Sequence, residues 1–338
     1  MASNTRRVIA QALSTLQRNT LHTGDPMGFN QDYWTGWASG LGLNKEGSPC
    51  IYTGRMYQML PYAQQASKLA NRYQGWLACP GMSQLMSWGN RVAGEKTLRR
   101  LAAPDQEIGQ RGARSLGGIA AGLRAIGLEP GYLFDAEPYS GVLLHDLGAD
   151  PGARKQAGRL AALFKARGVT QVTAVDPHTV HFLREVFPEY AEGAGVTVKH
   201  YLELLAPAVE RLRPRAKLPM DQVVVHDSCV MARYLGIVEP IRAVAKALGL
   251  EVLEPPNQGQ DTACCGGPIE YGFEELSNEV SLLRARELAG VGSQVMVTCP
   301  ICLLNLARHE QELGLRIWDL GELLGLALAD QPASQQPA

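Results

Sequence analysis

The 338-residue chain is 46% hydrophobic and 19% charged, and its formal net charge is −1 at pH 7. This balance is that of a globular protein whose core needs no disulfide bonds. The near-neutral charge argues against nucleic-acid binding, which usually requires a basic face. No stretch has the apolar length of a signal peptide or of a membrane span, so we expect a cytoplasmic protein with no transmembrane segment.

The N-terminal part is predicted to combine helices with an irregular segment. A first helix is expected over about residues 4–17, followed by an irregular lead-in over 19–49 that is rich in Gly, Asn and Asp. The sequence SPCIYTG then indicates a short strand near Cys50. Apolar residues at helical spacing predict helices over 57–73 and over about 93–127.

Further along the chain, predicted strands and helices alternate. The runs TQVTAV, DQVVVHDSC and SQVMVTC have the β-branched residues of strands, whereas FEELSNEVSLLRARELAG has helical periodicity. This alternation predicts α/β layers with mostly parallel sheets. The predicted division is an N-terminal helix with its lead-in, a first α/β unit with a helical insertion, a second α/β unit and a disordered tail, over 1–49, 50–205, 206–328 and 329–338.

The two predicted α/β units resemble copies of one design. Residues 124–141 match residues 246–266, because both contain a helix end, Gly-Leu-Glu, an extended piece and a turn that closes with Gly. From that Gly to the turn after the next predicted strand is 35 positions in the first copy and 33 in the second. The segments VKHYLELL and IWDLGELL follow at similar offsets. The expected fold is therefore two tandem pseudo-repeated α/β units with mostly parallel sheets.

Only the second copy keeps a set of cysteines, so the first copy is degenerate. Its matching positions carry other residues: Arg55 for Cys229, Tyr139 and Ser140 for Cys264 and Cys265, and Asp176 and Thr179 for Cys299 and Cys302.

Five of the seven cysteines fall between residues 229 and 302, in the pattern C-x34-CCGG-x31-CPIC. Clustered cysteines in a cytosolic chain indicate metal or redox chemistry rather than disulfide bonds. Each one follows a predicted strand or begins a helix, and the ends of parallel strands converge on one edge of a sheet. Helix N-termini stabilise thiolates, and Gly266 and Gly267 permit a tight turn. Five thiols are one more than a tetrahedral zinc ion or a cubane cluster uses.

This pattern resembles the cysteine-rich CCG domain found in the B-type and D-type components of heterodisulfide reductase. Related chains include iron–sulfur subunits of glycolate and lactate oxidation, of anaerobic glycerol-3-phosphate dehydrogenase and of sulfur-oxidising heterodisulfide-reductase-like complexes. The resemblance covers about residues 17–325, and it is specific in the second half and degenerate in the first. It implies a noncubane [4Fe–4S] cluster held by five thiolates, those of Cys229, Cys264, Cys265, Cys299 and Cys302.

The resemblance also implies partners and a reaction class. The first copy lacks its cysteines, so at most one cluster is expected. Ferredoxin-type cysteines are absent too, so electrons are expected to come from a separate ferredoxin-like subunit and a flavoprotein. The implied activity is thiol–disulfide redox chemistry on a sulfur substrate or a protein-bound persulfide, within a larger complex.

Two alternatives stay open. The chain could be an electron-relay iron–sulfur subunit of an FAD-linked oxidoreductase that acts on glycolate, lactate or glycerol 3-phosphate. It could instead be a non-catalytic subunit stabilised by zinc, since four thiolates suit that ion.

Two residues beside Cys229 are further candidates. His226 and Asp227 could hydrogen-bond the sulfur ligands or deliver a proton to a substrate sulfur. The alternative is that Asp227 caps a turn and that His226 is a packed core residue.

Other side chains have simpler interpretations. The lone Cys50 and Cys79 are expected to be small buried residues. Arg55 is expected to pair with an acid rather than with an anionic substrate. The turns of the degenerate copy also carry histidines, namely His145, His178 and His181. If the two half-sites face each other, His178 or His181 could supply a proton donor across the cleft, although replacement without a catalytic role is favoured.

Overall fold

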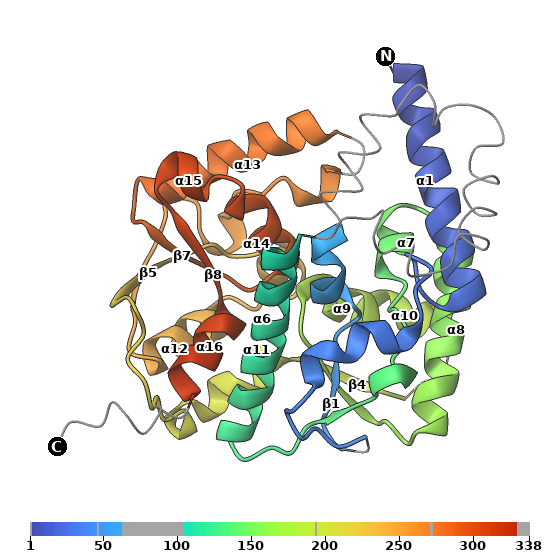
Figure 1. The fold of residues 1–338 in the computed structure, drawn as a ribbon, viewed down its shortest axis with the longest axis horizontal. Coiled ribbons are helices and arrows are strands. Elements are labelled where there is room, and N and C mark those ends of the chain that lie inside the picture. The colour runs from blue at the N-terminus through green and yellow to red at the C-terminus, as the bar shows by residue number, and fades with distance from the viewer. Residues whose placement is uncertain (1, 46, 63–104, 193–194, 271–272, 330–338) are drawn as a thin grey trace.

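The structure is a computed structural model that describes residues 2–45, 47–62, 105–192, 195–270 and 273–329 (Figure 1). Residues 56–62 are helical, and the rest of the helix expected over 57–73 lies outside the described residues, as does the start of the one expected from about 93. Cys79 and residues 330–338 of the expected disordered tail also lie outside them.

The described residues form two four-stranded sheets, and every strand pair in them is parallel. The first sheet has the order β2-β1-β3-β4 and the second β6-β5-β7-β8, so the two orders are the same. The strands are β1 (Cys50–Tyr52), β2 (Gly131–Tyr132), β3 (Gln171–Ala174), β4 (Thr197–His200), β5 (Gln222–Val225), β6 (Glu251–Leu253), β7 (Gln294–Val297) and β8 (Arg316–Asp319). We call the elements from β1 to α11 the first unit and those from β5 to α16 the second unit. The prediction of two tandem α/β units with parallel sheets is confirmed.

Helices surround both sheets. The first unit and the segment before it contain α1 (Ala2–Thr23), η1 (Gln31–Ala38), α6 (Gln106–Ala125), η2 (Phe134–Ala136), α7 (Val142–Asp146), α8 (Asp150–Ala166), α9 (Pro177–His181), η3 (Phe182–Val186), α10 (Phe187–Tyr190) and α11 (Tyr201–Leu205). The connection and the second unit contain η4 (Ala206–Arg211), η5 (Val230–Tyr234), α12 (Glu239–Ala247), η6 (Gly259–Asp261), η7 (Gly267–Ile269), α13 (Glu274–Ala289), α14 (Pro300–Ala307), α15 (Glu310–Leu313) and α16 (Leu320–Leu328).

Sheet register aligns the two units residue by residue. Cys50 pairs with Val172 in the first sheet, and Val224 pairs with Val295 in the second. Val172 lies four positions before Asp176, and Val295 lies four positions before Cys299. Five positions beyond Cys50 and Val224 are Arg55 and Cys229, so the register supports the match between these two residues.

The turns of the two units also correspond. Gly141 and Gly266 have φ of 92° and 79°, a conformation that glycine adopts without a steric penalty. At the last strand of each unit, His200 and Asp319 both begin a helix with a capping box. The repeat deduced from the sequence is therefore present in the backbone.

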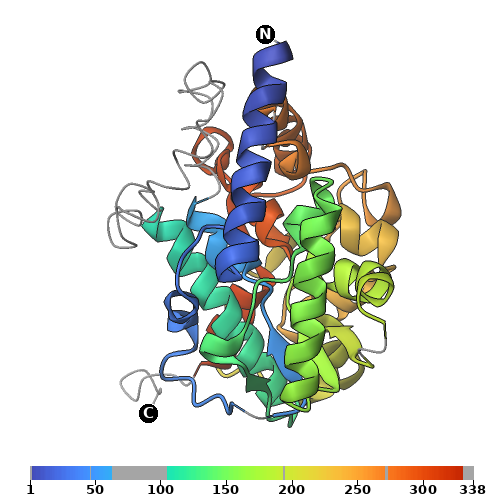
Figure 2. The same ribbon diagram turned by 90° about the vertical axis from the view of Figure 1, so that its right-hand side faces the viewer.

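The lead-in is less irregular than expected. Helix α1 extends to Thr23 instead of ending near residue 17, and Figure 2 shows it beside α8. Arg159 of α8 donates to the carbonyl of Thr20 at 2.9 Å, which holds the end of α1 on the first unit. Beyond it, η1 buries Trp34 against Phe29, with ring centroids 5.6 Å apart. Tertiary packing, which local propensity does not reveal, orders this segment.

The two units are joined by close packing of α6 on α16 (Figure 1). A Cβ atom added at Gly118 would lie 1.8 Å from the carbonyl oxygen of Gly321, so only glycine permits this approach of the two helices. Arg111 of α6 forms a buried ion pair with Glu322 of α16 at 3.3 Å. Ile119 and Leu324 belong to one hydrophobic cluster that spans both units.

Candidate metal centre

The cysteines lie at the carboxyl edge of the second sheet, where β5 and β7 end. Cys229 directly precedes η5, four residues after β5 ends at Val225. Cys299 is the N-cap of α14, and Cys302 lies in its first turn with Pro300 at the first helical position. Proline is tolerated there because its missing N–H would have no partner inside the helix. The sheet topology and a helix N-terminus thus position three of the five thiols.

The adjacent pair Cys264 and Cys265 lies in the loop between η6 and η7. A Cβ atom at Gly266 would lie 2.4 Å from the carbonyl oxygen of Ser277, and one at Gly267 would lie 2.1 Å from Cγ2 of Ile301. Both glycines are therefore required by the tight turn that the sequence predicted. The turn also directs the N–H of Gly266 to the sulfur of Cys264 at 3.3 Å.

The structure brings all five sulfur-bearing side chains together. The thiols form a continuous series in which each one perturbs the pKa of the next: Cys229 and Cys264, Cys264 and Cys265, Cys265 and Cys302, and Cys302 and Cys299. Cys265, Cys299 and Cys302 are buried, whereas Cys229 and Cys264 are half-buried. The series thus runs from a half-buried end to a buried end.

The surroundings lower the pKa of two of the five thiols. The neighbouring thiols of Cys229 and Cys265 lower the pKa of Cys264. Burial acts to raise the pKa of Cys299, but the neighbouring thiol of Cys302 and the positive charge of His178 lower it overall. Thiolate is the form that binds metals, so Cys264 and Cys299 are the two thiols whose surroundings favour that form.

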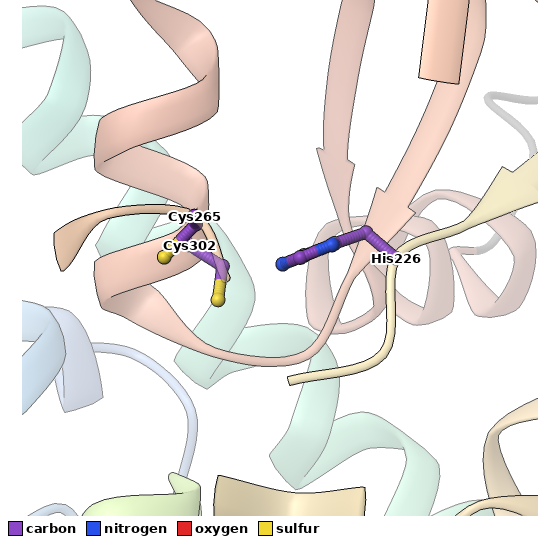
Figure 3. Close-up of side chains that lie close together, drawn as sticks. All are labelled: His226, Cys265 and Cys302. Atoms are coloured by element: carbon purple, nitrogen blue, oxygen red, sulfur yellow. The ribbon is translucent and has the colours of Figure 1, made fainter. Parts of the chain in front are cut away.

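His226 faces this pocket. Its imidazole and the sulfurs of Cys265 and Cys302 offer ligand atoms that all lie within 4.8 Å of one another, and Figure 3 shows the ring pointing at the two sulfurs. Nδ1 accepts a hydrogen bond from Nε of Arg284 at 3.1 Å, whereas Nε2 is buried without a hydrogen-bond partner among the described residues. Burial and the nearby charge of Arg284 lower the pKa of His226 to about 3, so its ring is neutral.

Asp227 is directed away from the thiols. Its two carboxylate oxygens each accept a hydrogen bond of 2.9 Å from Arg242, and one of them also accepts from the N–H of Gly259 at 2.7 Å. The hydroxyl of Thr262 donates to its carbonyl oxygen at 2.9 Å. Asp227 therefore ties the loop that carries Cys229 to the segment that precedes Cys264, which is the turn-stabilising alternative considered for it.

The equivalent region of the first unit is filled by a polar network. Arg55 is buried and forms an ion pair with Asp25 from the lead-in, so the expected pairing with an acid is confirmed. The same guanidinium donates to the carbonyl of Glu137. A Cβ atom at Gly54 would meet Oγ1 of Thr179 at 2.4 Å and Oγ of Ser140 at 3.3 Å, so these two replacement residues converge on Gly54.

The degenerate unit still contributes charge to the cysteine pocket. His178 of α9 bonds Asp146 at 3.1 Å, and α9 packs against η5 next to Cys229. Burial opposes protonation, but Asp146 and the Cys299 thiolate raise the pKa of His178 to about 9. His181 packs its ring on Tyr234, with centroids 5.1 Å apart, and His145 hydrogen-bonds Tyr190 at 3.2 Å.

Cys50 lies buried in β1, and its burial raises its pKa to about 12, as expected of a structural thiol.

Two arginines that support the site were not identified from the sequence. Arg242 and Arg284 are both on buried helix faces, of α12 and α13. In α13 the buried residues Ser277, Ser281, Arg284 and Leu288 recur at helical spacing. The position of Arg284 in this pattern was the sequence signal that could have indicated its burial.

Comparisons with known proteins agree with the location of the cysteine site in the second unit. Residues 223–307, which contain all five cysteines, match the family model of the cysteine-rich CCG domain. The sequence-based resemblance is thereby confirmed for the second unit.

Three curated relatives are similar over longer stretches. The probable iron–sulfur-binding oxidoreductase FadF of Bacillus subtilis is 27% identical over 60% of this chain and 30% of its own length. The EtfAB:quinone oxidoreductase of Syntrophomonas wolfei is 28% identical over 61% of this chain and 31% of its own. The D-type component of the dihydromethanophenazine:CoB–CoM heterodisulfide reductase of Methanosarcina acetivorans is 24% identical over 52% and 45%. The chain thus spans less than half the length of each of these proteins.

Among the described helices, none combines the length and apolar composition needed to cross a membrane.

Proposed function

We propose, from the premise that residues 223–307 are a CCG cysteine-rich domain, that this chain is an iron–sulfur redox subunit of a heterodisulfide-reductase-like complex. Cys229, Cys264, Cys265, Cys299 and Cys302 would hold one noncubane [4Fe–4S] cluster. The observation that carries the proposal is that five thiols gather at the carboxyl edge of one sheet, near enough for each to perturb the pKa of the next.

The donor set fits a multi-iron centre better than a single zinc ion. Zinc requires four ligands around one point, each about 2.0–2.3 Å from the metal. Within the described residues, the compact group of ligand atoms consists of Cys265, Cys302 and His226. The other three thiols are not members of this compact group, which favours a centre with several metal ions over one ion. Zinc nevertheless remains the alternative cofactor, because any four of these thiolates would suit it chemically.

The surroundings of the pocket suit sulfur chemistry. Reduction of a disulfide to two thiols consumes two electrons and two protons. When bound, the cluster would supply the electron transfers. His178, held by Asp146, keeps a positive charge near Cys299, and this charge favours the thiolate form of that proposed ligand. Cys229 and Cys264 are half-buried, so a substrate sulfur would approach from their side.

The proposed partners are a ferredoxin-like iron–sulfur subunit and a flavoprotein subunit, and the proposed location is the cytoplasm. One relative is named as a component of a heterodisulfide reductase, which supports a role within a complex. The name of another, EtfAB:quinone oxidoreductase, favours the second candidate, an electron-relay subunit linked to a flavoprotein.

The two candidates are separated by the response of the centre to thiols. The protein would be purified without oxygen, and its EPR spectrum recorded before and after oxidation in the presence of a low-molecular-weight thiol. A new signal that requires the thiol supports direct sulfur chemistry. A centre that exchanges electrons with a dye but is unaffected by the thiol supports the electron-relay subunit. About one zinc per chain without iron supports the non-catalytic subunit that zinc stabilises.

A further inference from the structure

We propose that His226 is a positioning residue that donates a hydrogen bond from Nε2–H to a sulfur of the bound centre, and that Arg284 fixes the tautomer that makes this possible. His226 would then stabilise the reduced centre without being one of its ligands. This inference rests on the proposed function, because it concerns the cluster that the five cysteines would hold.

The position of the ring is the first argument. His226 follows β5 directly, so the strand end fixes its backbone, and its side chain points at the sulfurs of Cys265 and Cys302 (Figure 3). The residue is 1% exposed. Nε2 is buried and has no hydrogen-bond partner among the described residues, although the ring points at the sulfurs of these two cysteines. Buried polar groups in native proteins usually have partners, so a group that is absent from the polypeptide is the expected acceptor.

The tautomer is the second argument. An arginine side chain has only donors and stays protonated in proteins. Since Nε of Arg284 donates to Nδ1 of His226 at 3.1 Å, Nδ1 must use its lone pair and cannot carry a proton. The proton of a neutral imidazole is then on Nε2. A nitrogen that carries a proton can donate to sulfur, but it has no lone pair for a metal ion.

Arg284 is itself held in place, so this tautomer is not easily reversed. Its guanidinium is 1% exposed and forms an ion pair with Glu287 at 2.8 Å. It also contacts the hydroxyl of Thr262 at 3.4 Å. Glu287 in turn accepts two hydrogen bonds from Asn257, at 2.9 and 2.8 Å. Such outer partners commonly fix the orientation of a histidine beside a metal site.

The expected consequence is electrostatic. Adding an electron makes the cluster sulfurs more negative, which strengthens an N–H···S hydrogen bond. Hydrogen bonds to the sulfurs are among the features that set cluster potentials. His226 should therefore raise the reduction potential, and the positive charge of Arg284 behind the ring acts in the same direction.

The test compares three variants of the full chain, prepared without oxygen. His226→Leu removes the donor, and His226→Gln restores an amide N–H. His309→Leu is the matched control, because His309 is also buried, also has an Nε2 without a partner among the described residues, and lies seven positions beyond Cys302. Iron, sulfide and the midpoint potential by EPR-monitored titration are measured for each.

We expect His226→Leu to retain the iron and sulfide of the wild type and to shift the midpoint potential to a more negative value. His226→Gln should recover part of the shift, and His309→Leu should show none. Loss of iron in His226→Leu, or an unchanged potential, would overturn the inference. If the wild type itself lacks iron, the proposed function fails instead, so the two failures are distinguishable.

A measurement without any substitution covers the case in which the variants fold poorly. Wild-type protein labelled with ¹⁵N-histidine is examined by pulsed EPR in the reduced state. A weak ¹⁵N hyperfine coupling is expected from a hydrogen-bonded ring. A strong coupling, typical of a nitrogen bound to iron, would show that His226 is a ligand and would overturn the assignment.

Discussion

Arg242 donates two parallel hydrogen bonds, each 2.9 Å long, to the carboxylate of Asp227. Asp227 is fully buried and lies two positions before Cys229, whereas Arg242 comes from α12 and also pairs with Glu254 at 2.7 Å. This arrangement connects a helix on the outside of the second sheet to the loop that carries a proposed ligand. The geometry of the cysteine pocket therefore depends on an ion pair that contains none of its thiols.

The first prediction concerns this ion pair. Asp227→Asn should lower the free energy of unfolding by about 3 kcal/mol, because it leaves the buried Arg242 without one of its carboxylates. Urea denaturation under anaerobic conditions measures the change. The matched control is Asp221→Asn, which breaks an exposed pair with Lys217 of 3.1 Å and should cost less than about 1 kcal/mol. Equal effects of the two substitutions would contradict the role assigned to Asp227.

The second prediction concerns the contact between the two units. Gly118→Ala should destabilise the protein by about 1–3 kcal/mol, because its Cβ would lie 1.8 Å from the carbonyl oxygen of Gly321 and force α6 away from α16. Thermal or chemical denaturation measures the loss.

The adjacent residue is the control for Gly118. A Cβ atom at Gly117 would have its nearest neighbour, Cδ1 of Leu41, at 3.9 Å, which is ordinary contact. Gly117→Ala should therefore stabilise α6 by about 0.5–1 kcal/mol, as replacing a glycine within a helix usually does. If both variants change the free energy of unfolding in the same direction, the close approach of α6 and α16 is not the reason why position 118 requires glycine.

The third prediction is a pH dependence that originates at His200. Burial and the charge of Arg184 lower the pKa of His200 to about 3 in the folded protein. Between pH 6.5 and that value the unfolded chain binds a proton that the folded chain does not, so stability is lost as the pH falls below 6.5.

His200→Asn tests this dependence, because Asn can also accept the capping hydrogen bond from Leu202 that Nδ1 accepts at 3.4 Å. Relative to its own value at pH 7.5, the wild type should lose about 1 kcal/mol more than the variant by pH 5.5. The other buried titrating groups are the same in both proteins, so their contributions to the pH dependence of stability cancel in this comparison. Parallel stability curves over this range would show that His200 does not stay neutral on folding.

Much of the fold followed from the sequence because it is repeated. β-branched runs, helical periodicity and glycine turns recur in the same order in both halves, and the two sheets have the same strand order. The register also reproduces the match of Arg55 with Cys229. The turn at Gly266 was predictable because two adjacent cysteines can be directed to one centre only from a tight turn.

Other features depend on contacts between segments that are distant in sequence. Asp25, in a lead-in expected to be irregular, is the partner of Arg55, thirty positions away. Arg284 reaches His226 across 58 positions. No local pattern encodes such pairs: helical spacing can indicate that an arginine is buried, but it does not identify the residue that the arginine contacts.

The most direct test of the central claim is the number of iron, sulfide and zinc atoms per chain in anaerobically prepared protein. We predict about four iron atoms with sulfide and negligible zinc in the wild type. Single Cys→Ala substitutions should lower the iron content at Cys229, Cys264, Cys265, Cys299 and Cys302. Cys50→Ala, which removes a thiol buried in β1 of the other unit, should retain it. About one zinc per chain without iron, or undiminished iron in all five variants, would contradict the proposal that these thiolates hold an iron–sulfur cluster.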